Sequence, residues 1–256
     1  MPNLFDNATN KQGLIVYGGE SSSDYGMVVA EAPAYERPVR KTTVYNVPGR
    51  NGAIIFQQDA WEDVPRSYKV WLAEDNNDSL VEKIDAFEAW LNTQKGYVRL
   101  EDNFEPDIFR LAYYSGGDGF SNHLAQYGEA TINFTCRPER FLKSGDTPIV
   151  VADGDTLTNP TKFVSKPLIY IEVQEAPTLP RVEVSINGTT IVASGFHDCI
   201  YIDCATMNAY RAPYLNSNMA ISGTFPVIEP GSNSIGIIDR VGSLKKIEIT
   251  PRYFSI

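Results

Sequence analysis

The sequence has little cysteine and little histidine, which limits the chemistry open to it. Among 256 residues there are three cysteines and two histidines. Cys136, Cys199 and Cys204 are too few for a disulfide framework, and their odd number favours a reducing folding compartment. A Ser-His-Asp or Cys-His nucleophile would have to use His123 or His197. We therefore predict no catalytic residue, no metal site and no bound cofactor, and the chain is not expected to be an enzyme.

Long apolar runs are also missing. No stretch approaches the roughly 18 to 20 consecutive apolar residues that span a bilayer. The first ten residues lack the basic and apolar regions of a secretion signal. From these absences we expect no membrane partner, no signal peptide and no anchor.

Basic residues are in the minority. The 22 Lys and Arg residues stand against 32 Asp and Glu residues, which gives a net charge of −10 and a pI near 4.7. Residues 1–143 carry 14 basic and 21 acidic residues, so most of the acidity is N-terminal. A protein that holds nucleic acid needs a basic surface, and this composition excludes such binding as the main role.

What the sequence does contain is mostly strand patterns, with a single convincing helix. Leu80, Ile84, Phe87 and Leu91 recur at steps of four and three, which predicts a helix over residues 78–94 that ends before Gly96. Strict alternation predicts half-buried strands at Tyr68–Leu72 and Ala130–Cys136. Asn187-Gly188 between two alternating runs predicts a tight hairpin over residues 182–193. Fold class is therefore mainly β, with one α-helix.

Turn-forming residues between 137 and 167 interrupt these patterns and mark a domain boundary. We expect an N-terminal domain over residues 1–143 and a C-terminal β-sandwich over residues 144–256. The last strand, at about residues 246–256, is a candidate for packing back on the first domain.

One alternative to a non-enzymatic role rests on clustered carboxylates. Glycoside hydrolysis needs a pair of them, and two acidic groups could supply such a pair: Asp59, Glu62 and Asp63, or Asp102, Glu105 and Asp107. Acidic clusters in acidic proteins are more often solvated loops. A second alternative places His197 beside Asp198 or Cys199 as a nucleophile system, although a turn leading into a strand is the simpler interpretation.

The segment Val47-Pro48-Gly49-Arg50-Asn51-Gly52 is the most distinctive loop. It combines a rigid proline, two glycines and a guanidinium within six residues, as a protruding hairpin or a tight contact needs. An ordinary surface turn is the competing interpretation. We predict that Pro48, Gly49, Arg50, Asn51 and Gly52 lie at or near a contact between subunits.

This turn is also the first of several segments that, in order and spacing, resemble the distal tail protein family of long-tailed siphophages. The matching segments run through the whole chain: Val47–Gly52, Ala89–Leu91 with Gly96 and Tyr97, Arg110–Tyr113, Gly128–Pro138, Asn159–Pro167, Tyr201–Asp203, Asn208–Tyr210, Ser222–Pro226 and Ile247–Arg252. Pro160 stands where the family often has glycine.

The resemblance implies a fold and an assembly. The N-terminal domain would be a β-sandwich or barrel-like domain with one helix, and the C-terminal domain a galectin-like sandwich of the kind found in carbohydrate-binding modules. The chain would form a homo-hexameric ring at the tail tip of the virion, after synthesis in the host cytoplasm. DNA would pass through the ring without being bound.

The partners implied by the family are the major tail tube protein, a tail-associated lysin or fibre protein, and receptor-binding proteins. The alternative is a carbohydrate-binding sandwich that assists host adsorption. All three tryptophans lie at or before residue 90, so the C-terminal domain has none for a sugar platform. Tyr201, Tyr210 and Tyr214 are the candidates there for contacts with a partner protein or a sugar, and protein partners are the favoured interpretation.

Overall fold

The computed structural model describes residues 13–73, 77–123, 127–174, 179–211 and 215–256. The chain divides between Arg140 and Phe141 into two compact units, each with its own buried hydrophobic core. We describe the two units separately. A separable N-terminal domain ending at residue 143 stays a prediction.

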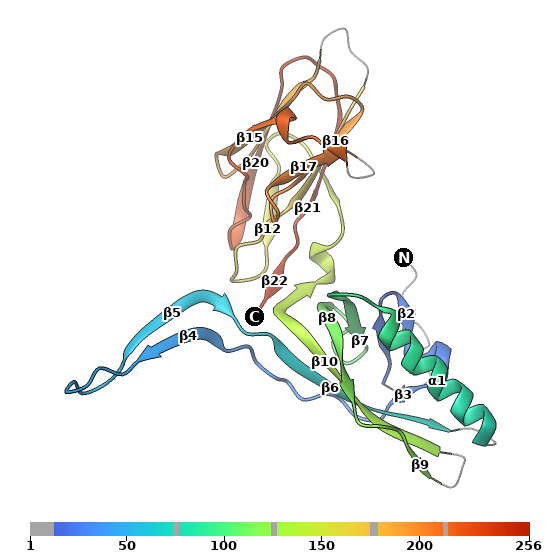
Figure 1. The fold of residues 1–256 in the computed structure, drawn as a ribbon. Helices are drawn as coiled ribbons and strands as arrows, with labels where there is room; N and C mark the ends of the chain where they lie inside the picture. The colour runs from blue at the N-terminus through green and yellow to red at the C-terminus, as the bar shows by residue number, and fades with distance from the viewer. Residues whose placement is uncertain (1–12, 74–76, 124–126, 175–178, 212–214) are drawn as a thin grey trace. The chain divides into compact units, whose positions relative to one another are not determined.

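The first unit is built on a nine-stranded antiparallel sheet (Figure 1). Within it, β10 pairs with β6 over ten residue pairs, from Tyr127↔Ala73 to Cys136↔Val64, so the two strands predicted from alternation are neighbours. The strands in spatial order are β2 (Glu20–Ser21), β1 (Ile15–Tyr17), β7 (Val98–Asp102), β8 (Ile108–Gly117), β10 (Tyr127–Leu142), β6 (Val64–Ala73) and β3 (Val28–Val29), with β9 (Ser121–His123) pairing with β10. The ninth strand, β22 (Phe254–Ser255), also pairs with β10, and its residues belong to the second unit.

The helix α1 (Asn77–Thr93) covers one face of this sheet. Its predicted apolar stripe is confirmed, because Leu80, Phe87 and Leu91 are almost fully buried. Trp90 packs beside them and its indole N–H donates to the backbone oxygen of Tyr17 at 3.1 Å. Gly96, with φ of 70°, takes the left-handed conformation expected after the helix.

The second unit has two antiparallel sheets that share one core, and it is therefore a β-sandwich. The six-stranded sheet consists of β11 (Ile149–Val151), β21 (Leu244–Thr250), β13 (Leu168–Val173), β16 (Cys199–Asp203), β17 (Asn208–Arg211) and β18 (Leu215–Asn216). The five-stranded sheet consists of β12 (Thr156–Asn159), β20 (Gly231–Asp239), β14 (Arg181–Ile186), β15 (Thr189–Ser194) and β19 (Ile221–Gly223). Three short 3₁₀ helices complete the described chain, namely η1 (Ser22–Tyr25), η2 (Lys143–Gly145) and η3 (Asn218–Ala220).

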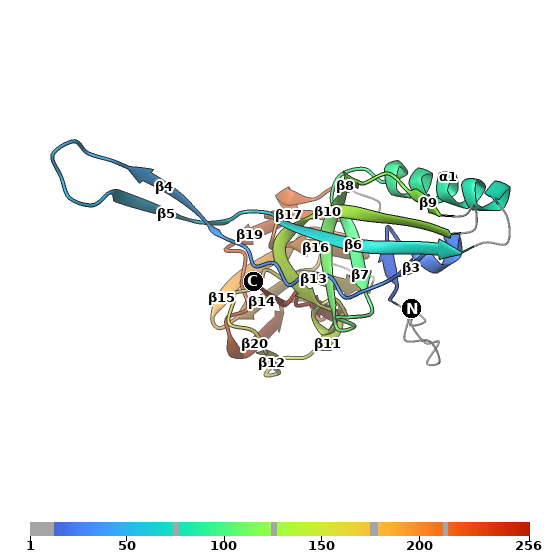
Figure 2. The same cartoon turned by 90° about the horizontal axis from the view of Figure 1, so that it is seen from below.

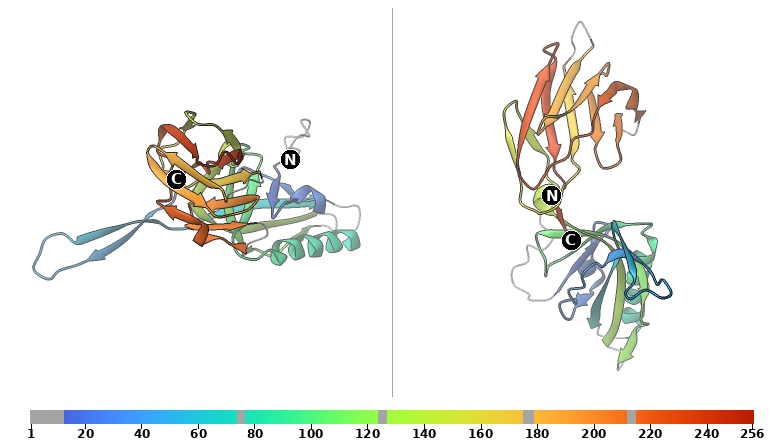
Figure 3. Two further views of the ribbon diagram at one scale, coloured as in Figure 1. Left: turned by 90° about the horizontal axis from the view of Figure 1, so that it is seen from above. Right: turned by 90° about the vertical axis from the view of Figure 1, so that its left-hand side faces the viewer.

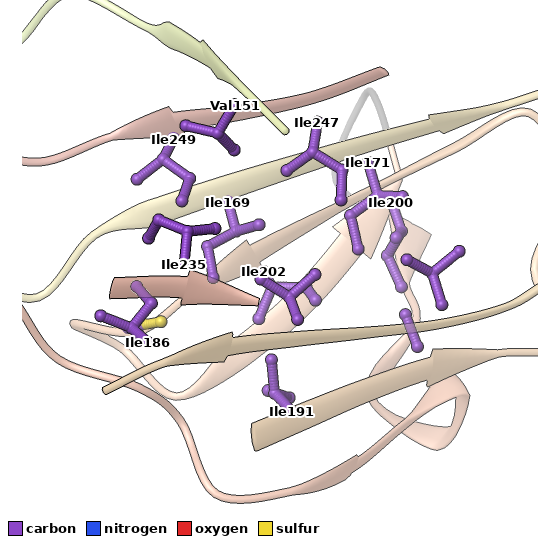
Figure 4. Close-up of a cluster of buried hydrophobic side chains, with 14 of the residues drawn as sticks. Val151, Ile169, Ile171, Ile186, Ile191, Ile200, Ile202, Ile235, Ile247 and Ile249 are labelled. Carbon is purple, nitrogen blue, oxygen red and sulfur yellow. The ribbon is translucent and has the colours of Figure 1, made fainter. Parts of the chain in front are cut away.

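Aliphatic side chains from both sheets meet in the core of the sandwich, as Figure 4 shows for ten labelled residues. Every second residue of β13 and β14 is buried, which is the period expected of strands with one buried face. The predicted Asn-Gly hairpin is confirmed as β14 and β15, with Asn187 and Gly188 at φ of 49° and 81°.

The fold class is therefore mainly β with a single α-helix among the described residues, as predicted. The segment at residues 246–256, predicted as the last strand, contains most of β21 and all of β22. Within the second unit, β21 lies between β11 and β13. The short β22 pairs with β10, and beside it the Leu142 N–H donates to the Tyr253 oxygen at 2.9 Å.

Candidate assembly site

A two-stranded ribbon, which we call the arm, carries the predicted contact turn. It consists of β4 (Arg40–Tyr45) and β5 (Ile54–Trp61), which pair with each other and with no other strand of the described residues. Figures 2 and 3 show the arm extending from the first unit at the end opposite α1. The turn Val47–Gly52 is therefore placed at the tip of a protruding hairpin.

The tip has the geometry that its sequence predicts. The Arg50 N–H donates to the Val47 oxygen at 3.2 Å, which closes a turn with Pro48 and Gly49 at its centre. Gly49 has φ of 80°, the left-handed conformation that the third position of a Pro-Gly turn requires. Pro48, Gly49, Arg50, Asn51 and Gly52 are all exposed and lie together at the tip. This geometry leaves the guanidinium of Arg50 available to another molecule.

Large apolar side chains cover the arm and were not among the predicted site residues. Val44, Tyr45, Ile55 and Phe56 are between 54% and 61% exposed. The rings of Tyr45 and Phe56 meet edge to face with centroids 5.7 Å apart. An isolated two-stranded hairpin is marginally stable in water, and exposed apolar patches of this kind usually mark interaction sites.

Where the arm leaves the sheet, Arg40 of β4 contacts two residues of β5. The guanidinium lies 4.9 Å from the centre of the Trp61 ring and donates to Asp59 at 3.0 Å. The Asp59 carboxylate is fully exposed, so this ion pair contributes little to stability.

A buried ion-pair cluster lies in the first unit next to the start of the arm. Arg66 donates to Asp102 at 2.7 Å and to Glu105 at 3.2 Å, and Tyr68 also donates to Asp102 at 2.7 Å. Glu105 accepts further from Arg110 at 2.5 Å and from Arg140. The four arginines Arg66, Arg110, Arg137 and Arg140 line a cavity of only about 20 Å³.

These contacts argue against the glycosidase alternative. Burial acts to raise the pKa of Glu105, but the surrounding Arg110, Arg140 and Arg66 lower it below its usual value. A general acid needs a raised pKa instead. Asp102 is 2% exposed and is held by Arg66 and Tyr68. The two carboxylates are therefore explained by packing and charge pairing.

The residues of the alternative nucleophile system, His197 and Asp198, lie beside a groove, and Asp198 is paired with an arginine. Asp198 pairs with Arg211 at 2.8 Å, beside an open groove of about 350 Å³ that His197 also lines. Within the described residues, no group of three or more His, Cys, Asp or Glu side chains could hold a metal ion. None of the helices in the described part of the chain is long and apolar enough to cross a membrane.

Two predicted contact residues of the second unit come together in a row of tyrosines. On the outer face of the six-stranded sheet, Tyr170 is paired with Tyr201 and Tyr201 with Tyr210 in the strand register. Tyr201 stacks on Tyr210 with centroids 5.4 Å apart and meets Tyr170 at 4.8 Å. Tyr170 was not predicted, and Tyr214 lies outside the described residues.

Each ring in this row is partly buried and contacts a neighbouring side chain. Because β16 lies between β13 and β17, Tyr201 has a tyrosine on each side. The Lys246 ammonium lies 5.4 Å from the centre of the Tyr170 ring. Burial, with the nearby Cys199 and Glu172, raises the pKa of Tyr170 to about 12. The ring faces that Tyr201 and Tyr210 present to each other are therefore not available to a sugar.

A family model matches most of the first unit. Residues 32–136 match the family of the phage tail protein RIFT-related domain. Among curated proteins, none matches this sequence.

Solved structures of phage tail components are similar over nearly the whole chain. The hub adsorption protein Dit (gp 19.1) of phage SPP1 is 14% identical, with 95% of this chain and 99% of that chain covered and a TM-score of 0.67. A chain of the phage P2 baseplate, in its activated conformation with Ca, is 12% identical, with coverage of 93% and 96% and a TM-score of 0.55. A chain of the same baseplate with Sr has a TM-score of 0.53 at 12% identity, with coverage of 93% and 97%. The family domain and the shared fold together confirm the resemblance stated from the sequence.

Proposed function

We propose, from the phage tail domain in residues 32–136 and the distal tail protein fold of the chain, that this protein is the structural hub of a siphophage tail tip. Six copies form a closed ring that joins the tail tube to the baseplate. The arm is the observation that carries this proposal, since an apolar ribbon that extends from its own unit needs another molecule to cover it. In a closed ring, every arm is covered by a neighbouring copy through the same contact.

The charge of the first unit suits a channel for DNA. Outside the arm, residues 1–140 contain 10 basic and 20 acidic residues. A negative wall repels phosphate, so a duplex passes without being held. The role is thus structural and not hydrolytic, with the tail tube protein on one side of the ring and a lysin or fibre protein on the other.

Light scattering tests the ring directly. The purified chain is expected to have a mass near six times 28.4 kDa. A chain that stays monomeric up to high micromolar concentration would contradict the proposed ring.

Arg50→Ala is expected to weaken this assembly while leaving the fold intact. Arg50 offers a planar five-donor fork at the tip of the arm, suited to a carboxylate or to backbone carbonyls of the next copy. The concentration of half-assembly, measured by light scattering, should rise several-fold. Arg181→Ala is the control, because Arg181 is an exposed arginine of the second unit. Wild-type assembly of the Arg50 variant at all salt concentrations would refute the contact.

For the second unit we propose docking of peripheral baseplate or receptor-binding proteins. The stacking of Tyr201 on Tyr210, and the absence of tryptophan from this unit, support this over a lectin role. Calorimetric titration of the full-length chain with host cell-wall polysaccharide is therefore expected to give no saturable heat. Saturable binding that Tyr210→Ala abolishes would instead make this unit a carbohydrate-binding module.

A further inference from the structure

The arm has two faces of different composition. Side chains alternate along a strand, and cross-strand partners share a face. The register pairs Thr43 with Phe56 and Tyr45 with Ile54, and these four residues form what we call the aromatic face. The pairs Thr42 with Gln57 and Val44 with Ile55 form the aliphatic face.

Both faces expose large apolar side chains. Tyr45 and Phe56 on the aromatic face are 56% and 58% exposed, and Val44 and Ile55 on the aliphatic face are 54% and 61% exposed. A ribbon that lies on a surface with one side in water alternates between apolar and polar residues. Strands buried on both sides instead have continuous apolar runs, and Val44-Tyr45 opposite Ile54-Ile55-Phe56 is such a run.

Charge indicates which molecule covers the arm. Residues 40–61 contain three basic residues and one acidic residue, whereas the rest of the chain contains 19 basic and 31 acidic residues. A basic arm on an acidic chain is complementary to another copy of the same chain. In a ring, each copy gives one arm and receives one.

We infer that neighbouring copies of this chain contact the arm on both faces, an arrangement that we call the clasp. The arm is then inserted between two protein surfaces, with neither its aromatic nor its aliphatic face left in water. This inference rests on the proposed ring and makes it more specific. The apolar side chains of both faces are then removed from water on assembly, at roughly 25 cal/mol for each Å² buried.

Two adjacent residues provide the test, because Ile55 and Phe56 point to opposite faces with nearly equal exposure. Ile55→Thr and Phe56→Thr each remove apolar surface from one face, and threonine retains a preference for strands. Gln58→Thr is the control on the same strand, since Gln58 is polar and exposed. Sedimentation velocity over a concentration series gives the concentration of half-assembly for each full-length variant, and circular dichroism checks that each is folded.

A two-sided clasp predicts that Ile55→Thr and Phe56→Thr each raise the concentration of half-assembly tenfold or more, with Gln58→Thr close to wild type. If only one of the two variants weakens assembly, the clasp is wrong and the proposed ring survives with a one-sided arm. If neither variant has an effect while the wild type forms rings, the arm is not the contact at all. The two failures are therefore distinguishable.

Discussion

Replacing Asp102 with alanine is expected to lower the free energy of unfolding of the first unit by about 3–5 kcal/mol, the usual cost of removing one partner from a buried ion pair. The Asp102 side chain is 1% exposed and the Arg66 side chain 5%. The Asp102 carboxylate oxygens accept from Arg66 and Tyr68, and also from the backbone N–H groups of Phe104 and Glu105 at 3.1 and 3.0 Å. Without Asp102, the Tyr68 hydroxyl still accepts from Arg66 but loses the acceptor for its own proton, and both backbone N–H groups lose the acceptor described here. Urea denaturation followed by circular dichroism measures the loss.

Asp59→Ala is the matched control for this experiment. Asp59 also pairs with an arginine, Arg40, but its carboxylate is fully exposed. Exposed ion pairs contribute about 0–1 kcal/mol. A loss at Asp102 no larger than the loss at Asp59 would mean that the buried cluster does not hold the first unit together.

The second large effect is expected for Phe134→Ala, which should lower the free energy of unfolding of the first unit by about 3–5 kcal/mol in the same urea denaturation. This ring is fully buried in the middle of β10. It meets Tyr17 at 4.9 Å, and Tyr68 and Tyr114 at 5.9 Å each, all at steep angles between the ring planes. Its removal leaves a cavity between three aromatic rings, which the strands on either side of β10 cannot collapse to fill.

Tyr35→Ala is the surface comparison, since Tyr35 is 65% exposed and should change stability by less than about 0.5 kcal/mol. Both variants should be measured below the concentration of assembly, because association stabilises the folded chain. Equal effects at Phe134 and Tyr35 would contradict the packing described for this core.

Local patterns predicted the elements whose signals are local. Four apolar residues at helical spacing were sufficient for α1, and Asn187-Gly188 was sufficient for the hairpin of β14 and β15. The turn at Pro48-Gly49 was likewise recognised from residue types that favour positive φ. Each of these features depends on residues that are close in the sequence.

Features that depend on long-range pairing were not predictable in the same way. Thr42–Tyr45 and Ile54–Phe56 have strand composition, but composition alone does not show that β4 and β5 lack further neighbours and extend as an arm. Tyr170 joins Tyr201 and Tyr210 only through the register of three strands. Asp102 and Glu105 were considered as catalytic carboxylates because their arginine partners, such as Arg66, are far away in the sequence.

The distribution of aromatic residues between the two cores gives each unit its own optical signature. Trp61, Trp71 and Trp90 all belong to the first unit, whereas the core of the second unit is mostly aliphatic. Tryptophan emission excited at its red edge therefore reports the unfolding of the first unit only, and the backbone signal reports both. Any part of a denaturation curve that changes ellipticity without changing the emission comes from the sandwich, so an unmodified chain reveals whether the two units unfold together or in turn.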